Sequence, residues 1–147
     1  MQEAWQSANL LDDQVEEIFS YAYDSKLGYL TSCPSNVGTG LRASVMLHLP
    51  GLVLLEEMDP VVNGISKIGL AVRGMWGEGT DAVGNMFQVS NQITLGKDES
   101  QIINHLEQIV LELVDHEVNA RERLMNEKQL IIEDHICRAF GLSLIHI

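Results

Sequence analysis

The sequence predicts an α+β fold in which an antiparallel sheet is flanked by helices. Residues 41–49 alternate apolar and polar side chains with a period of two, which is typical of a strand with one buried face. Residues 98–126 instead place apolar side chains at helical spacing over a long stretch. The predicted strands and helices do not alternate regularly along the chain, and this favours an α+β arrangement with helices on one side of the sheet.

Before the alternating strand, the chain is predicted to form a helix, a short strand and a loop. Asp12 and Asp13 precede apolar residues at helical spacing, which predicts a helix over about 13–23 with an aspartate cap. Residues 28–32 are β-prone, so we expect a strand there. Residues 33–40 contain a proline, two glycines and small hydroxyl side chains, a composition typical of a loop.

After the alternating strand the apolar spacing becomes helical. Pro50 ends the strand, and the helical spacing of residues 52–68 is interrupted near Asp59 and Pro60, where a proline can begin a second helix. We therefore expect two helical pieces rather than one. Residues 69–72 are then predicted to form a short buried strand.

The last part of the chain is predicted to contain a glycine-rich loop, one more strand and two helices. Residues 74–84 include four glycines, and residues 85–94 have the pattern of a strand. A long helix is expected over 98–126 and a further helix over 127–140. The apolar tail, residues 142–147, has no predicted partner.

Composition and charge restrict the class of protein. A chain of 147 residues fits one ordinary domain, and its formal net charge of −12 argues against nucleic acid or an anionic membrane as partner. No apolar run approaches the roughly 20 residues that cross a bilayer, and the N-terminus lacks the pattern of a secretory signal. Cys33 and Cys137 lie far apart and suggest no disulfide framework. We therefore expect a cytoplasmic protein.

The loop that leads into Arg42 is the first candidate for chemistry. Its backbone N–H groups and the guanidinium of Arg42 are suited to holding a phosphate. It is not a P-loop, because the lysine is missing and a strand rather than a helix follows. The alternative is an ordinary loop whose arginine forms a salt bridge at the end of the strand. Composition alone favours that alternative.

Cys33 stands at the start of this loop, two residues before the hydroxyl of Ser35. A thiolate there is open to stabilisation by hydroxyl and backbone donors. The alternative is a buried cysteine that acts as a small apolar side chain. No feature of the sequence identifies a general base, so a hydrolase with a cysteine nucleophile has little support.

The second candidate is the glycine-rich segment that begins at Arg73. An arginine at the end of a strand, followed by a loop with one carboxylate, suits a lid that closes on a ligand. Arg73 would hold an anion, and Glu78 a cation or a transferable proton. The alternative is a surface hairpin with a solvated Glu78, although Trp76 at the tip of the loop favours a functional role.

The histidines carry no predicted site. His48 shares the polar face of the alternating strand with Arg42, where a hydrogen-bonded structural role is the simpler interpretation. The other histidines lack the spacing of metal ligands, so no metal site is predicted on the chain itself.

The stretch from Cys33 to Arg42, Cys-Pro-Ser-Asn-Val-Gly-Thr-Gly-Leu-Arg, resembles the Cys-Pro-(Ser/Thr)-Asn-Leu-Gly-Thr signature of the phosphagen (ATP:guanido) kinases. Arg73-Gly74 followed by Gly77-Glu78 is similar to the flexible loop of that family. Residues 42–48 and 90–96 most resemble bacterial protein arginine kinases. The resemblance covers about residues 4–120, and it implies part of a guanidino kinase (glutamine synthetase-like) catalytic domain over residues 1–120. Residues 121–147 would be the truncated start of a C-terminal helical region.

The resemblance also implies roles for individual residues. Arg42 and Arg73 would grip the nucleotide phosphates, and Glu78 would face the substrate guanidinium as a catalytic residue. Cys33 would lie beside that guanidinium as a thiolate that tunes its charge. Further nucleotide-site residues would be Ala43, Ser44, Val45 and Met46, together with the closing loop of Gly74, Met75, Trp76, Gly77 and Glu78.

The activity implied is ATP-dependent phosphoryl transfer to arginine residues of proteins, with Mg²⁺ bound through the nucleotide phosphates. Partners would be protein substrates that bear arginine, and a second copy in a full-length homodimer. The family's acidic Asn-Glu-Glu-Asp-His segment and its further phosphate-binding arginines are not in this sequence. The chain is therefore expected to be an inactive fragment. Alternatives are a phosphagen kinase for a free guanidino metabolite and a non-catalytic nucleotide-binding or interaction module.

Overall fold

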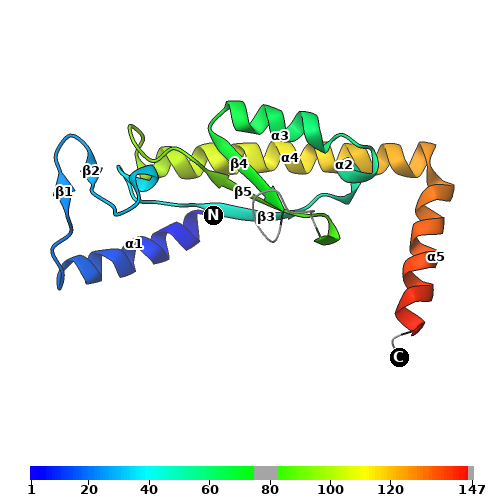
Figure 1. Cartoon of the computed structure of the whole chain (residues 1–147), viewed down its shortest axis with the longest axis horizontal. Helices are drawn as coiled ribbons and strands as arrows, with labels where there is room; N and C mark the ends of the chain where they lie inside the picture. Colours follow the sequence, from blue (N-terminus) through cyan, green and yellow to red (C-terminus); the bar gives the residue numbers. More distant parts are fainter. Residues whose placement is uncertain (75–82, 146–147) are drawn as a thin grey trace.

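A three-stranded antiparallel sheet and one long helix form the centre of the molecule (Figure 1). The computed structural model describes residues 1–74 and 83–145. The strands are β3 (Ser44–His48), β4 (Leu70–Gly74) and β5 (Met86–Asn91), and their order in the sheet is β3-β5-β4. Helix α4 (Glu99–Glu127) has 29 residues and runs along the sheet. The predicted α+β fold with an antiparallel sheet is confirmed.

The strand register gives the sheet two faces: one that helices α3 and α4 cover, and an opposite one, called the free face here because neither of these two helices packs on it. Val45 of β3 lies opposite Val89 of β5, which in turn lies opposite Val72 of β4. Because successive side chains of a strand point to opposite faces, the neighbouring row, Met46, Gln88 and Arg73, belongs to the other face. The alternation predicted for residues 41–49 therefore appears in the structure as two chemically different faces.

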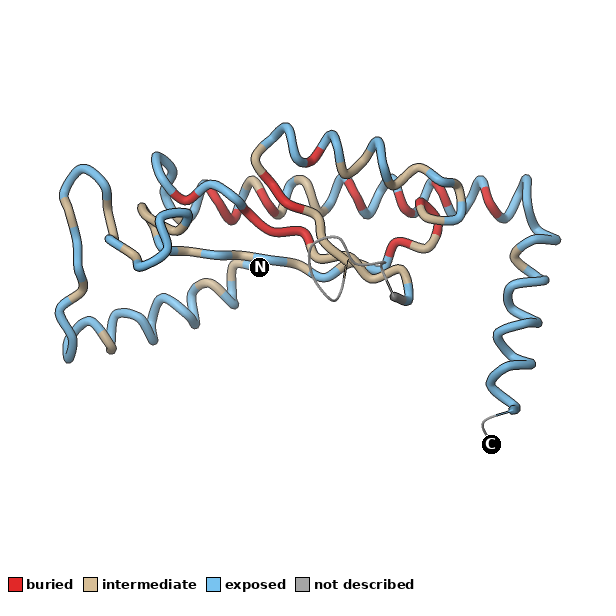
Figure 2. The backbone as a smooth tube through the Cα atoms, in the orientation of Figure 1, coloured by how far each residue is buried: buried red, intermediate tan, exposed pale blue. Residues whose placement is uncertain are grey.

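Two helices cover the valine face of the sheet. Helix α3 (Met58–Lys67) contributes Ile65 to the core, and α4 contributes Leu106 and Leu113. Val89 and Leu106 are fully buried, and burial of one such side chain stabilises a fold by roughly 1.5–3 kcal/mol. Figure 2 shows the buried segments gathered along the sheet and along the part of α4 that passes beside it.

A short helix, α2 (Pro50–Leu54), connects the end of β3 to α3. Pro50 is its first residue, a position where proline is favoured because no N–H is needed there. The two predicted helical pieces are therefore present, but the break between them falls at residues 55–57, ahead of Pro60. Pro60 lies in the first turn of α3.

The predicted N-terminal helix is misplaced. Helix α1 (Gln2–Glu16) starts well before Asp12 and Asp13, which lie in its last turns rather than at its start. The upstream residues are mostly good helix formers, so nothing stops the helix from extending to Gln2. A small hairpin follows, formed by β1 (Tyr23–Asp24) and β2 (Gly28–Tyr29), so the strand predicted over 28–32 is shorter than expected.

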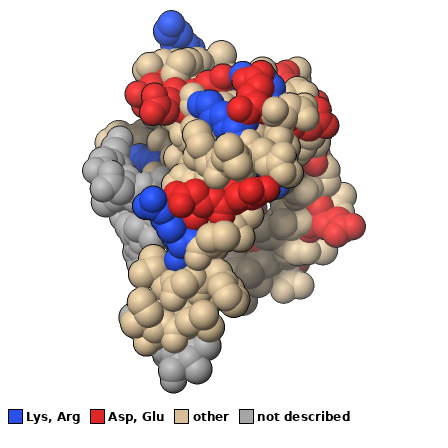
Figure 3. Space-filling model, turned by 90° about the vertical axis from the view of Figure 1, so that its right-hand side faces the viewer, with Lys and Arg blue, Asp and Glu red and all other residues tan. Residues whose placement is uncertain are grey.

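Both C-terminal helices are present. Asp98 caps α4, because its carboxylate accepts the Gln101 N–H and the Gln101 side chain returns the bond. Helix α5 (Gln129–Ile145) continues beyond the predicted end at residue 140. Figure 3, which looks onto the α5 side, shows that the part of the surface next to the grey terminal atoms carries no charged side chain in that view. None of the helices in the described ranges is long and apolar enough to cross a membrane.

Candidate functional site

The loop from Cys33 to Arg42 is held in a defined shape by its own backbone. A single 3-10 turn, Pro34–Asn36, follows Cys33, and the Asn36 N–H donates to the Cys33 carbonyl over 3.0 Å. Beyond this turn, Gly38 bridges to Tyr29 of the hairpin. The predicted loop is thus an ordered structure that connects the hairpin to strand β3.

Gly38 is needed because the backbone of another segment passes close to it. Its φ is +116°, and a Cβ at this position would lie 2.3 Å from the carbonyl oxygen of Thr94. The neighbouring Thr39 N–H donates to that same carbonyl over 3.2 Å. The loop is therefore packed directly onto the segment that follows β5.

Cys33 is exposed, so its predicted alternative as a buried apolar residue does not apply. Its Sγ atom lies 3.0 Å from the Ser35 hydroxyl oxygen. Hydrogen bonds from the Ser35 side chain and backbone lower the pKa of the Cys33 thiol, partial burial opposes this, and the charge of Arg42 contributes in the lowering direction. The stabilisation of a thiolate that the sequence suggested is therefore supported by this geometry.

Arg42 lies at the entrance to β3, and its side chain is exposed. The main chain on either side of it is bound to Asn91: the Ala43 N–H donates to Oδ1 over 2.8 Å, and Nδ2 donates to the Leu41 carbonyl over 3.0 Å. The guanidinium thus extends from a fixed backbone at the edge of the sheet.

Arg73 comes from the opposite edge strand, β4, and its residue is half-buried. Its cross-strand neighbour on the free face is Gln88, whose amide donates to the Ser44 hydroxyl over 3.0 Å. Because strands are spaced by about 4.8 Å, the edge strands β3, which Arg42 precedes by two residues, and β4, which carries Arg73, are roughly 10 Å apart, with β5 between them. The two arginines therefore frame the free face of the sheet.

The other predicted nucleotide-site residues divide between the two faces. Ser44 and Met46 are exposed, whereas Ala43 and Val45 pack partly buried against the core. Gly74 ends β4. The remaining residues predicted for the closing loop, Met75, Trp76, Gly77 and Glu78, lie outside the described residues.

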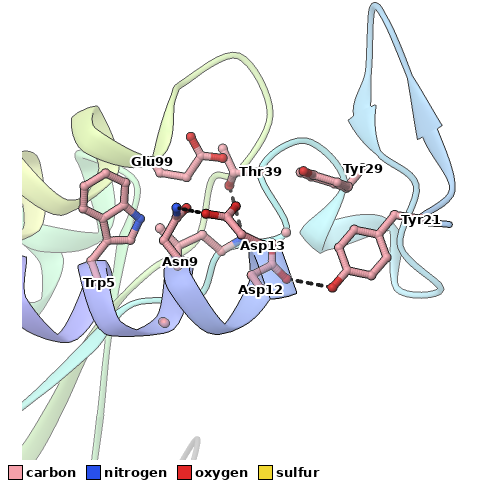
Figure 4. Close-up of a pocket in the computed structure, with 11 residues that line it drawn as sticks. Trp5, Asn9, Asp12, Asp13, Tyr21, Tyr29, Thr39 and Glu99 are labelled. Atoms are coloured by element: carbon pink, nitrogen blue, oxygen red, sulfur yellow. Dashed lines mark hydrogen bonds between the residues drawn. The ribbon is translucent and has the colours of Figure 1, made fainter. Parts of the chain in front are cut away.

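A cleft of about 340 Å³ lies beside the loop from Cys33 to Arg42, between α1 and the hairpin (Figure 4). Figure 4 shows Asp12 directed toward the Tyr21 hydroxyl, which donates to it over 2.9 Å, while Asn9 donates to Asp13 over 3.2 Å. Burial and the hydrogen bond to Asp12 raise the pKa of Tyr21. Among the predicted catalytic and nucleotide-binding residues that the structure describes, none lines this cleft.

Three features of this region were not predicted as functional. The Asp12–Asp13 pair was interpreted as a helix cap, but it lies in the last turns of α1 and lines the cleft. No pattern in the sequence indicates that these two residues face a cleft. Asn91 and Thr94 were noted only as part of a resemblance. A usable signal existed for Asn91, because it is a polar residue in phase with Phe87 and Val89 on the buried side of β5.

The position of His48 and the arrangement of possible metal ligands are also defined in the described part of the chain. His48 is exposed on the free face, and its backbone carbonyl accepts from the Arg121 guanidinium over 3.3 Å. Within residues 1–74 and 83–145, no group of three or more histidine, cysteine or acidic side chains is arranged to hold a metal ion. The described charged residues that frame the free face are arginines, which suit an anion rather than a cation.

A family model described as ATP:guanido phosphotransferase, C-terminal catalytic domain, matches residues 1–120. The chain belongs to this family. Among curated relatives of this ATP:guanido phosphotransferase chain are two named protein-arginine kinase, from Desulforamulus reducens and Caldanaerobacter subterraneus subsp. tengcongensis. They are 54% and 50% identical to it over 142 residues, or 97% of the chain. The chain spans only 40% and 42% of their lengths.

Solved structures of two guanidino kinases resemble this chain. A lombricine kinase matches 86% of the chain with a TM-score of 0.65 and 33% sequence identity, and the match covers 33% of that kinase. A duplicated taurocyamine kinase from Schistosoma mansoni, solved with bound components of a transition-state analogue, matches 73% of the chain with a TM-score of 0.62. Its identity is 31%, and 15% of that protein is covered. The described sheet and helices are thus similar to part of these larger kinases.

Proposed function

We propose that this chain is the C-terminal part of a protein arginine kinase, which transfers a phosphoryl group from ATP to the guanidinium of arginine residues in proteins. The observation that supports the proposal is that Arg42 lies just before edge strand β3 while Arg73 lies in the opposite edge strand, β4. The relatives named protein-arginine kinase, which are about half identical along the chain, support the choice of substrate.

The two arginines would bind and neutralise the phosphate oxygens of ATP. In phosphoryl transfer the transition state carries its charge on these oxygens, so catalysis depends on positioning and on electrostatic stabilisation. Guanidinium groups hold phosphates through paired hydrogen bonds and stay charged at all physiological pH values. Ser44 and Met46, exposed on the free face, would contact the nucleotide through their side chains, and the half-buried Ala43 and Val45 would line the same site beside them.

The substrate guanidinium needs activation, because it is normally protonated and its lone pairs are delocalised. In our proposal the carboxylate of Glu78 orients it and accepts its proton, as a general base does. Hydrogen bonds from Ser35 lower the pKa of the Cys33 thiol. The resulting thiolate would lie beside the substrate guanidinium, where its negative charge stabilises the positive charge of that group. The attacking nitrogen then forms a bond to the γ-phosphorus as the bond to the ADP oxygen breaks.

Mg²⁺ would enter with ATP rather than bind to the protein. The described residues contain no cluster of carboxylates that would form a cage for the ion, whereas phosphate oxygens are good ligands for it. Its chemistry is neutralisation of charge on the phosphates. We further propose a cytoplasmic location and protein substrates as partners, in keeping with the bacterial relatives.

The test uses a full-length kinase that contains this segment, with the substitutions Arg42→Ala and Arg73→Ala, and measures acid-labile phosphoarginine on a protein substrate. Loss of one phosphate-binding arginine should lower kcat/KM for ATP by about 100-fold, since a hydrogen-bonded charge contact is worth up to about 3 kcal/mol. Lys67→Ala, which removes an exposed cation of α3, is the matched control. Unchanged turnover in both arginine variants would show that Arg42 and Arg73 do not bind the nucleotide phosphates.

A second candidate is a kinase for a free guanidino metabolite, and the similarity to lombricine and taurocyamine kinases favours it. Comparing phosphorylation of free arginine with that of an arginine-rich protein separates the two. A third is a non-catalytic nucleotide-binding module. Calorimetric titration of the 147-residue chain with ATP tests whether it binds nucleotide, and we expect no turnover by the chain alone.

A further inference from the structure

Two buried polar side chains, Asn91 at the end of β5 and Thr94 three residues later, contact the loop from Cys33 to Arg42. Only 4% of Asn91 and 5% of Thr94 is exposed. Buried polar groups are costly unless they are hydrogen-bonded, so the partners of these two residues indicate what they hold in place.

Asn91 binds the main chain on both sides of Arg42. Its Oδ1 accepts the Ala43 N–H over 2.8 Å, and its Nδ2 donates to the Leu41 carbonyl over 3.0 Å. Its own N–H donates to the Ala43 carbonyl over 3.2 Å. An amide side chain offers an acceptor and a donor at the same time, whereas a carboxylate offers only acceptors and an aliphatic side chain neither.

Thr94 binds the first half of the same loop. Its hydroxyl lies 2.8 Å from the Val37 carbonyl and 3.1 Å from the Ser35 carbonyl, and it donates toward both. Its carbonyl accepts the Thr39 N–H over 3.2 Å. Ser35 is the residue whose hydroxyl lies beside the Cys33 sulfur, so Thr94 acts on Cys33 through the orientation of Ser35.

We propose that Asn91 and Thr94 are positioning residues of the phosphoryl-transfer site, which fix the Arg42 guanidinium and the Cys33 thiol at a constant separation. The proposal rests on the proposed function. Neither side chain binds the Arg42 guanidinium or the Cys33 thiol directly. Both bind main-chain atoms of the loop, which lie 48 to 59 residues earlier in the sequence. Preorganisation of this kind matters because small errors in the placement of a catalytic group cost large factors in rate.

The first experiment needs no kinase activity. In a Cys137→Ser background, Cys33 is the only thiol of the chain, and its rate of alkylation by iodoacetamide is measured against pH. Thr94→Val should move the midpoint of this profile upward, toward that of an ordinary thiol, and Thr94→Ser should restore the original midpoint. Gln92→Ala, an exposed residue of the same segment, is the control that should leave it unchanged. A folded Thr94→Val variant with the original midpoint would overturn the role of Thr94.

A second measurement covers the case in which Thr94→Val does not fold. In the unsubstituted chain, amide hydrogen exchange should be slow at Ala43 and Thr39, whose N–H groups donate to Asn91 and Thr94. Exchange at these two amides as fast as in an unstructured peptide would overturn the proposal without any variant.

The third experiment uses the full-length kinase with Asn91→Asp and Asn91→Leu. Displacement of Arg42 should raise the KM for ATP by at least about 10-fold and leave the KM for the arginine substrate within about twofold. A residue that only supports the fold would reduce the amount of active enzyme and change neither KM. An unchanged KM for ATP in folded variants would therefore refute the role of Asn91. If the unsubstituted kinase phosphorylates no arginine, the proposed function fails, and alkylation and exchange still decide whether the two residues hold the loop.

Discussion

Glu117 offers the sharpest test of how helices α2 and α4 are joined. It is 4% exposed in the middle of α4, yet it carries a carboxylate. Its two oxygens accept the N–H groups of Gly51 and Leu52 at the start of α2, over 2.8 and 3.0 Å. One of them also accepts from Arg121 Nε over 2.6 Å. The carboxylate therefore satisfies helix N–H groups that have no partner within α2.

The expected loss of stability in Glu117→Ala follows from these contacts. A hydrogen bond to a charged group contributes about 1.5–3 kcal/mol, and Gly51 and Leu52 are buried, so water does not replace it freely. The Arg121 side chain is 51% exposed, and that ion pair therefore adds less than about 1 kcal/mol. Allowing for non-additivity, we expect a loss of about 3 kcal/mol for Glu117→Ala. For Glu117→Gln, which keeps one acceptor, we expect about 2 kcal/mol.

Urea unfolding followed by circular dichroism measures this loss. With a slope of about 1.5 kcal/mol per M, the midpoint of Glu117→Ala should fall by about 2 M. Arg121→Ala should move it by less than about 0.7 M, and Glu122→Gln, an exposed residue of the same helix, should leave it nearly unchanged. If Glu117→Ala were no less stable than Arg121→Ala, the argument that Glu117 joins α4 to α2 would be refuted.

Three further changes test other parts of the structure. Ser35→Ala should raise the pKa of Cys33, because the hydrogen bonds that lower it come first from Ser35, so alkylation at neutral pH should slow; an equal or faster rate contradicts this. Gly38→Ala should cost roughly 2–4 kcal/mol in thermal unfolding, since its Cβ would meet the Thr94 carbonyl at 2.3 Å, and an unchanged melting temperature would show that the loop can move away. Asp98→Ala should cost about 1 kcal/mol in urea by removing the capping box, whereas Asp98→Asn should keep most of it.

The sequence predicted best those elements in which local pattern and tertiary burial agree. The strand around Ser44–His48 and the helix Glu99–Glu127 were both expected within a few residues of their observed bounds, because each has one apolar side that the fold covers. Helix α1 was misplaced because an aspartate pair is equally compatible with a helix start and with the exposed side of a late turn. Ile18 and Phe19, which were assigned to that helix, lie beyond its end and are mostly exposed.

For the candidate site, the sequence predicted the charged and thiol residues but not the residues that hold their main chain in place. Arg42, Arg73 and Cys33 stand out because a guanidinium or a thiol in a glycine-rich segment is chemically conspicuous. Asn91 is marked in the sequence only as a polar residue on the buried side of β5, and Thr94 is recognised only once its partners, more than 50 residues earlier in the chain, are known. Long-range hydrogen bonds of this kind have no local sequence pattern.

The position of β5 in the middle of the sheet determines when the sheet can assemble. Strands β3 and β4 are not neighbours: each pairs only with β5, which is the last of the three in the chain. During synthesis, neither edge strand has a partner in this sheet until residue 91 has left the ribosome, and the helix that covers the valine face is completed later still. The sheet therefore forms from contacts distant in sequence, and the emerging chain exposes its apolar strands until β5 and α4 have been made.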